Sequence, residues 1–218
     1  MTNKLFKAAL LLVLLSLPFG AVSAKKMKAV DLGLSVKWAP CNVGAAAPEE
    51  FGDYFAWGEI TPKEDYSWKN LKYCGDPGGN SFSKYNTKER YGAVDNLTQL
   101  DMSDDAARAI LRGNWRMPTR EEWKELREKC NWEWTELNGV KGYKVTGPSG
   151  NNIFLPCGGL KSNTSTANVG SYGIYWTATL YESYPYSAYN LYFNSIGIYP
   201  DEDSYRSYGL TVRAVSTK

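Results

Sequence analysis

No histidine occurs among the 218 residues of this sequence. The absence excludes histidine general bases, Ser-His and Cys-His nucleophile pairs, and histidine metal ligands. No Cys-x-x-Cys motif occurs either, which argues against a zinc site. Catalysis would have to rest on carboxylates, Lys, Tyr or Cys, and no convincing set of these stands out. We therefore expect no catalytic residues, no metal and no cofactor, and predict that the protein is not an enzyme.

Long hydrophobic runs are also missing. The most apolar stretch, residues 8–17, is too short to span a bilayer comfortably. Residues 1–7 before it carry two lysines, and Ala21-Val22-Ser23-Ala24 after it is a pattern of small residues. This layout predicts a secretory signal peptide at residues 1–24 and a single domain at residues 25–218. We expect an exported protein of the periplasm, cell surface or extracellular space, with no membrane insertion after cleavage.

An excess of charge is missing too. The formal net charge is +2, and loss of Lys4 and Lys7 with the signal peptide leaves it at zero. A neutral chain lacks the basic surface that binds nucleic acid, so we expect no nucleic-acid partner.

Aromatic residues, by contrast, are abundant. Eight Trp and sixteen Tyr indicate a folded chain, because disordered chains are poor in aromatics. Ten of the tyrosines lie between Tyr172 and Tyr208, so the enrichment is local.

Four cysteines form an even set, as expected of disulfides in an exported protein. They allow three complete pairings, and the sequence does not choose among them. The residues are Cys41, Cys74, Cys130 and Cys157.

Helix signals are confined to the middle of the chain. "SDDAARAILRG" predicts a helix with Ser103 as its N-cap, and "PTREEWKELREKC" predicts one that opens with a capping box of Thr119 and Glu122. In the second helix Trp123 and Leu126 recur at helical spacing, while the charged residues face water. We interpret these acids as a solvated helix face and not as a catalytic carboxylate pair.

Strand signals flank the helices. "DLGLSVKWAP" alternates with period two, "KGYKV" and "NIFLP" surround a turn, and "GIYWTATL", "AYNLYF" and "GLTVRAV" favour further strands. Residues 61–98 are dense in turn formers and predict a long irregular segment, for which Cys74 is a candidate tether. Strands at both ends with two helices between them predict an α+β fold.

Six blocks carry a family resemblance: "VDLGLSVKWAPCNVGA", "GDYFAWGE", "WRMPTREEW", "NGVKGYKVTGPSGNNIFLP", "YWTATL" and "YGLTVRAV". In this order they resemble the Fibrobacter succinogenes major paralogous domain family of exported proteins. The resemblance implies a C-type-lectin-like fold, with paired termini, two helices, a small and mostly antiparallel, irregular set of β-sheets, and a C-terminal variable surface. Since Cys41 and Cys130 lie inside family-like blocks, it also suggests that they form one disulfide and that Cys74 and Cys157 form another.

Some members of that family resemble the variable proteins of diversity-generating retroelements. In those proteins a C-terminal region, here about residues 172–213, is rewritten at template adenines. An asparagine codon can thereby become one for Tyr, Ser or Asp, but not one for Glu or Trp. Glu182 and Glu202 would then have to be fixed or differently encoded positions, and Trp176 would have to be framework.

The residues give an independent reason to expect a binding surface. Alternation in "AYNLYFN" places Tyr189, Leu191 and Phe193 on a buried face, and Asn190, Tyr192 and Asn194 on an outward face. "IYPDEDSYRSYG" contains Pro200 and three acids, and predicts a surface loop. Tyrosine with Ser and Asn is also the composition of antibody binding loops. Tyr172, Tyr175 and Tyr189 are interpreted as framework. The predicted ligand-binding residues are Tyr181, Tyr184, Tyr186, Ser187, Tyr192, Asn194, Tyr199, Asp201, Ser204, Tyr205 and Tyr208.

We therefore predict an adhesin-like, secreted or surface-displayed protein that binds a protein or glycan and is displayed through a pilus or another anchoring partner. One alternative is a structural pilus or surface subunit without a ligand. Another is an enzyme of the formylglycine-generating type, which would need a reactive cysteine pair in a pocket with a bound metal, with Cys157 beside a Gly-rich stretch as the candidate. Calcium-dependent sugar binding is a third alternative, but the triplets that lectins use for it are missing, and "PDED" is only a loose acidic cluster.

Overall fold

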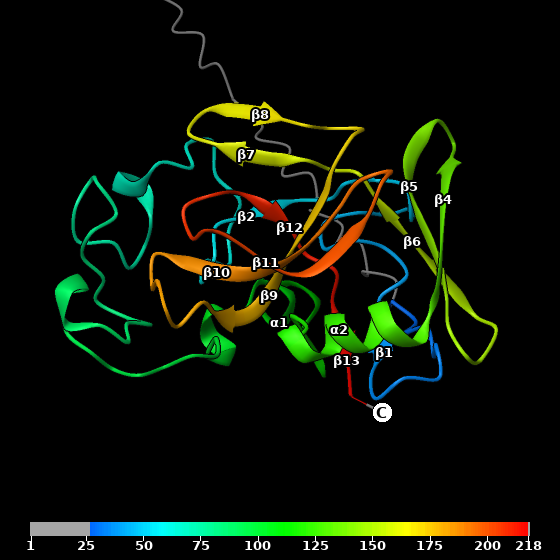
Figure 1. Cartoon of the computed structure of the whole chain (residues 1–218), viewed down its shortest axis with the longest axis horizontal. Helices are drawn as coiled ribbons and strands as arrows, with labels where there is room; N and C mark the ends of the chain where they lie inside the picture. Colours follow the sequence, from blue (N-terminus) through cyan, green and yellow to red (C-terminus); the bar gives the residue numbers. More distant parts are fainter. Residues whose placement is uncertain (1–26, 218) are drawn as a thin grey trace, which may run out of the picture.

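The computed structural model describes residues 27–217, and the predicted signal peptide at residues 1–24 lies outside them. The described residues form two α-helices, three short 3-10 helices and thirteen strands in four small sheets (Figure 1). The predicted α+β class with two helices and mostly antiparallel strands is confirmed. No helix in this part of the chain is long and apolar enough to cross a membrane.

Strands from the two ends of the described chain meet in one three-stranded sheet. β1 (Lys37–Trp38) and β3 (Trp115–Arg116) pair on either side of β13 (Val215–Ser216), both antiparallel. The pairing that the resemblance implied is therefore present.

A buried arginine reinforces this closure. The Arg213 side chain is fully buried, and its guanidinium donates to the carbonyls of Ala39 at 3.0 Å and Phe154 at 2.8 Å. Its Nε donates to Asn42 Oδ1 at 2.9 Å. Three hydrogen bonds thus join the C-terminal segment to two distant parts of the chain.

The largest sheet lies at the centre of the molecule (Figure 1). Its order is β11 (Ile198–Tyr205), β10 (Ser187–Phe193), β9 (Gly173–Leu180), β12 (Leu210–Thr211) and β2 (Tyr54–Phe55). β12 runs parallel to β9, and the other neighbours are antiparallel. Every residue of β9 is buried, which is expected for a strand covered on both faces.

The edge strand β11 corrects one prediction. Residues 198–205 form a strand and not the surface loop that Pro200 suggested. Proline is tolerated on edge strands and at bulges, where its missing N–H removes no ladder hydrogen bond. The register shifts at this point, since Asn190 opposes Glu202 while Tyr192 opposes Tyr199. Hence proline marked an edge strand rather than a loop.

Two peripheral sheets complete the strands. β4 (Asn131–Leu137), β5 (Val140–Thr146) and β6 (Asn152–Pro156) form an antiparallel meander, which confirms the predicted hairpin between "KGYKV" and "NIFLP". β7 (Leu160–Ser162) and β8 (Ser165–Ala167) form a separate two-stranded ribbon.

The longer helix follows its sequence signals closely. α2 (Arg120–Lys129) begins after Thr119, whose hydroxyl accepts from the Glu122 backbone N–H, while the Glu122 side chain accepts from the Thr119 N–H. The predicted capping box is therefore confirmed. Trp123 and Leu126 are buried against the core, as their spacing indicated.

The shorter helix begins later than predicted. α1 (Ala106–Leu111) has Asp105 as its N-cap, with the carboxylate accepting from the Arg108 N–H. Ser103 lies instead in a 3-10 turn, η3 (Met102–Asp104). Either side chain could cap a helix, and the burial of Asp104 among distant partners fixes the later start.

The N-terminal alternation confirms the burial pattern but only part of the strand. Leu32 and Leu34 are buried and Gly33 and Ser35 are exposed, but the strand covers only Lys37–Trp38. The reason is that the backbone N–H of Ser35 donates to the Glu125 carboxylate on α2 and not to a neighbouring strand.

The predicted disulfides are wrong for this structure. All four cysteines are free thiols, each in its own environment. The Cys41 thiol donates to the Ala45 carbonyl and the Cys74 thiol to the Asp76 carbonyl, while Cys157 is buried in the hydrophobic core. Burial raises the Cys157 thiol pKa to about 12. A thiol that is protonated at neutral pH does not support the reactive cysteine that the enzyme alternative requires.

Candidate ligand-binding surface

Five of the predicted tyrosines gather into one row of touching rings. Ring centroids lie 5.7 Å apart for Tyr181 and Tyr184, 5.5 Å for Tyr184 and Tyr186, 5.8 Å for Tyr186 and Tyr205, and 5.4 Å for Tyr205 and Tyr208. We call these five residues the tyrosine row. Edge and tilted contacts at these distances are the favourable ones for aromatic pairs, so the rings hold one another in place.

Two aromatic residues from the irregular segment extend this row. Trp68 lies 5.7 Å from Tyr205, and Tyr91 lies 5.6 Å from Tyr186. Both belong to short 3-10 helices, η1 (Trp68–Asn70) and η2 (Glu89–Tyr91). We did not predict them as part of the surface. The signal that could have identified these two residues is that each is aromatic and lies in an otherwise polar stretch.

The irregular segment itself is as predicted. Residues 61–98 contain η1 and η2 but no strand, and this cyan-to-green stretch lies at the left of Figure 1. Since Cys74 forms no disulfide, other contacts must hold the irregular segment in place.

One anchor of the irregular segment is the carboxylate of Asp104, which is 1% exposed. It accepts from Lys72 at 2.9 Å, Tyr73 at 2.8 Å, and Lys84 and Tyr85 at 2.7 Å. Burial alone would raise the pKa of Asp104, but these four donors outweigh burial and hold that pKa well below its usual range. A single buried carboxylate thus fixes residues 72–85.

The second anchor is Arg206, which follows the row residue Tyr205 and is fully buried. Its guanidinium donates to the carbonyls of Lys84 at 3.2 Å, Tyr85 at 3.2 Å and Pro185 at 3.0 Å, and stands 4.6 Å from the Phe82 ring centroid. Burial lowers its pKa to about 10, which leaves it charged at neutral pH. Arg206 therefore joins the irregular segment to the tyrosine row.

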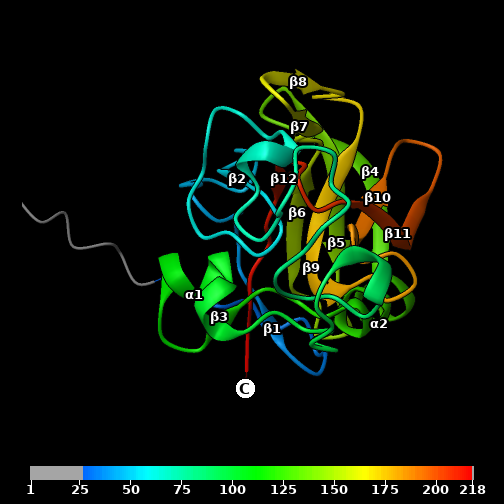
Figure 2. The same ribbon diagram turned by 90° about the vertical axis from the view of Figure 1, so that its left-hand side faces the viewer.

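A second surface lies on the hairpin of β10 and β11, which stands at the right-hand edge of Figure 2. Here a groove of about 400 Å³ opens over β9, β10 and β11. We call it the polar groove. It is lined by Ile174, Asn190, Tyr192, Asn194, Tyr199, Glu202, Asp203 and Ser204.

Aromatic rings form one part of the polar groove. Tyr192 on β10 opposes Tyr199 on β11, and their ring centroids lie 5.8 Å apart with 30° between the planes. The Tyr172 ring packs against Tyr192 at 5.3 Å. Tyr199 is 44% exposed, so it presents a ring to solvent while Tyr192 is half-buried behind it.

Asn194 has a structural role in the same groove. Its Oδ1 accepts from the backbone N–H groups of Ile196 and Gly197 and so shapes the turn between β10 and β11. Its Nδ2 donates to the Tyr192 hydroxyl at 2.9 Å. Both ends of this amide are engaged within the protein.

Asn190 lies deeper and is only partly satisfied. Its side chain is 1% exposed, and Nδ2 donates to Ser204 Oγ at 3.0 Å. No hydrogen-bond partner reaches its Oδ1 from the described residues. A buried acceptor without a donor costs about 1–3 kcal/mol, so this amide is a site where a ligand donor would be gained.

Two of the predicted contact residues lie elsewhere. Ser187 is fully buried, so its placement on an exposed surface is wrong. The Asp201 carboxylate turns to α2 and accepts from Arg120 at 2.6 Å and Lys124 at 3.0 Å. Partial burial would raise the pKa of Asp201, but the hydrogen bonds from these two cations outweigh it and lower that pKa. The sheet separates Asp201 from the polar groove.

The tyrosines interpreted as framework differ in burial. Tyr175 is fully buried, as expected. Tyr189 is only half-buried, because its ring lies beside α2 with the Arg120 guanidinium 4.1 Å from the ring centroid. Leu191 and Phe193 are buried as predicted.

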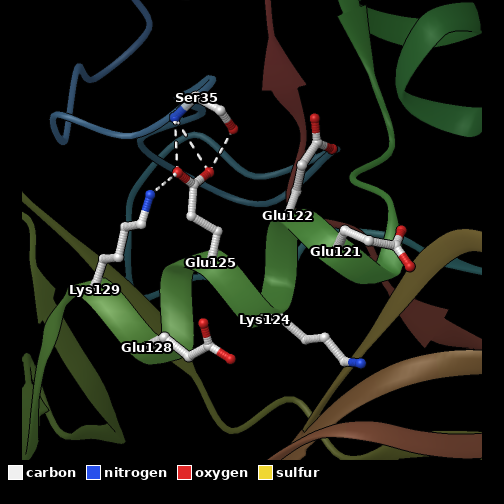
Figure 3. A pocket seen from close by; sticks show the side chains of 7 residues that line it. All are labelled: Ser35, Glu121, Glu122, Lys124, Glu125, Glu128 and Lys129. Carbon is white, nitrogen blue, oxygen red and sulfur yellow. Dashed lines mark hydrogen bonds and ion pairs between the residues drawn. The ribbon is translucent and has the colours of Figure 1, made fainter.

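A hollow beside α2 offers no convergent chemistry (Figure 3). Glu125 is bound by the Ser35 N–H and hydroxyl groups and by Lys129 at 2.9 Å. Glu121 and Glu128 lie at opposite ends of the helix in Figure 3 and are exposed. This pattern fits the solvated helix face that the sequence indicated. No group of three or more Asp, Glu or Cys side chains is placed to hold a metal ion within residues 27–217.

Comparison with known proteins gives one match. A protein-family model described as a domain of unknown function (DUF8237) matches residues 134–215, which is less than half of the chain. The matched span contains the whole polar groove and all five residues of the tyrosine row, but not Trp68 or Tyr91. No curated protein matches the chain, and no solved structure matches it.

Proposed function

We propose that this protein is an exported binding protein that contacts another macromolecule through the tyrosine row. The observation that carries the proposal is the row itself, in which five tyrosines from separate positions become one continuous surface of aromatic rings with polar rims. Tyr184 and Tyr205 are 43% and 45% exposed. Both therefore keep nearly half of their surface available to a partner.

The physical properties of the row suit recognition. Tyrosine offers a large, amphipathic contact area with few rotatable bonds, which lowers the entropy cost of binding. Here each ring is also held by its neighbours, so little freedom remains to be lost. Aromatic residues are moreover the side chains enriched at binding hot spots.

We also propose that the fold is C-type-lectin-like. In support, β1 pairs with β13, two helices flank the sheets, and the central sheet carries the tyrosine-rich strands. On this view residues 172–213 form the variable region. The burial of Trp176 in β9 fits its expected role as fixed framework. Differences between gene copies confined to template adenines would support diversification by a retroelement, and differences spread evenly along the gene would contradict it.

The binding proposal is tested by probing arrays of purified extracellular proteins and glycans with the protein. Each ligand found is then measured against a Tyr184→Ala/Tyr205→Ala variant, with Ile110→Ala on α1 as a control that removes exposed apolar surface elsewhere. We expect a loss of affinity in the double variant alone, with both variants still folded by circular dichroism. Absence of any ligand, or retention of affinity by the double variant, would contradict the proposal.

A further inference from the structure

The polar groove contains acceptors that have no donor within the described residues. Glu202, which opposes Asn190 in the ladder, presents an exposed carboxylate on this face, and the buried Asn190 holds an Oδ1 without a donor. The amide N–H groups nearby are engaged, since Asn194 Nδ2 donates to the Tyr192 hydroxyl and Asn190 Nδ2 donates to the Ser204 hydroxyl. A group that supplies donors would satisfy the carboxylate and the amide oxygen.

Among the described residues, no cation is paired with the carboxylate of the groove. Neither Lys nor Arg is among its lining residues. Arg120 and Lys124, on the other face of the hairpin, are bound to Asp201. Arg206 is buried and directed into the irregular segment. The Glu202 carboxylate is thus available to a positive charge from outside.

The rings of Tyr192 and Tyr199 add a flat aromatic wall. A planar cation stacks favourably on the face of such a ring. The guanidinium combines that planarity with five N–H donors in a fixed fork, whereas an ammonium is a compact point charge with three. A guanidinium therefore matches several acceptors at separate positions beside an aromatic wall better than an ammonium does.

From this geometry we propose that the polar groove binds the guanidinium of an arginine side chain on the macromolecular ligand. The inference rests on the proposed binding function and names the chemistry of one contact. Glu202 supplies the negative charge, Tyr199 supplies the ring face, and the Asn190 amide gains its missing donor. Sugar hydroxyls fit less well, because they carry no positive charge to pair with the Glu202 carboxylate.

The test uses tri-arginine peptide as the probe, with tri-lysine and triglycine as comparisons, in low-salt buffer by calorimetry. We expect tri-arginine to bind with a dissociation constant below about 1 mM. Tri-lysine should bind at least about fivefold more weakly, and triglycine should give no signal. No tri-arginine binding, or equal binding of tri-lysine, would overturn the assignment.

Matched charge variants separate a defined site from general electrostatics. Glu202→Gln removes the carboxylate charge of the groove, and Glu182→Gln removes one exposed charge outside it. We expect a loss of at least about tenfold in tri-arginine affinity for the first variant and less than twofold for the second. Equal losses in both would show only bulk attraction and overturn the proposal.

Amide chemical shifts give a second measurement that does not depend on variants. Addition of tri-arginine to the wild-type protein should move the signals of residues 190, 199 and 202–204 and leave those of the tyrosine row in place. Shifts confined to other residues would contradict the proposal.

The two proposals fail in distinguishable ways. Tyr184→Ala/Tyr205→Ala should keep its affinity for tri-arginine, because neither residue lines the groove. If array ligands depend on those tyrosines but tri-arginine does not bind, the groove assignment fails and the binding function stands. If tri-arginine binds at the groove but no macromolecule needs the tyrosine row, the groove assignment stands and the proposed binding function fails.

Discussion

The tyrosine row and the polar groove are built from the same C-terminal segment but are supported differently. The row rests on the irregular segment through Trp68, Tyr91 and the buried Arg206. The groove rests on β9, β10 and β11, whose ladders hold it without help from residues 61–98. Similar tyrosine-rich sequence thus gives one surface that depends on distant polar anchors and one that depends on local strand pairing.

This difference indicates where each surface is vulnerable. Strand ladders surrounded by buried apolar residues open only with global unfolding, whereas segments held by a few polar contacts can open locally. Loss of an anchor should therefore disturb the row first and the groove last.

The largest effect is expected for Arg206→Ala. It leaves three buried carbonyl groups without their donor and opens a cavity beside Phe82, which together should lower the free energy of unfolding by about 4 kcal/mol. Amide exchange in residues 72–92 should accelerate, while exchange in β9 and β10 tracks global stability. Urea unfolding and hydrogen exchange measure both.

The matched control for that change is Arg90→Ala, which removes an exposed arginine from the same segment. It should alter stability by less than about 0.5 kcal/mol. Equal effects of the two substitutions would show that Arg206 is not an anchor.

The next largest effect is expected for Asp104→Asn. The change removes a buried charge that accepts from Lys72, Lys84 and two tyrosines, and breaking such a pair should destabilise the protein by about 3 kcal/mol. The half-exposed Asp101, which also binds Lys84, is the control. Asp101→Asn should cost less than about 1 kcal/mol. A smaller loss for Asp104→Asn than for Asp101→Asn would contradict this assignment.

Acid should distinguish the two surfaces without any substitution. Because the pKa of Asp104 is lowered by folding, its stabilising effect is complete above the unfolded carboxyl value of about 3.9 and is lost as the pH falls toward the lower folded value. We expect exchange in residues 72–85 to accelerate below about pH 4 before exchange in β10 does. The Asp104→Asn variant should lack this acceleration of exchange at low pH. If the variant keeps it, other carboxyl groups are responsible.

The smallest effects are expected for single rings. Tyr205→Ala removes ring contacts with Trp68, Tyr186 and Tyr208 and should lower the free energy of unfolding by about 1–2 kcal/mol. Tyr199→Ala removes one ring contact and should cost about half as much. Chemical denaturation compares them, and a greater loss for Tyr199→Ala would contradict the idea that the row is held by its own rings.

Local signals in the sequence predicted much of this fold. The capping box at Thr119 sets the start of α2 directly, and the apolar residues of "GIYWTATL" match the limits of β9. Such features depend on neighbours within a few residues. The residues around each feature are therefore sufficient to predict it.

Other features depend on residues that are far apart in the chain. Nothing around Arg206 indicates burial, because the carbonyl groups that bind it belong to Lys84 and Tyr85 in the irregular segment and to Pro185, which lies 21 residues earlier. Pro200 suggested a loop because the sequence did not show that this strand lies at a sheet edge. Likewise the sequence did not reveal that five of the eleven predicted contact residues belong to the tyrosine row, four to the polar groove and two to neither, since that division follows from the pairing of β10 with β11.

The central claim is that the tyrosine row is the contact surface for a macromolecule. The most direct test is the ratio of dissociation constants between Tyr184→Ala/Tyr205→Ala and the wild-type protein for one ligand found on the arrays. Two hot-spot residues at the centre of an interface should raise that ratio to about 100 or more. A ratio within about twofold, in a variant that remains folded, would contradict the claim.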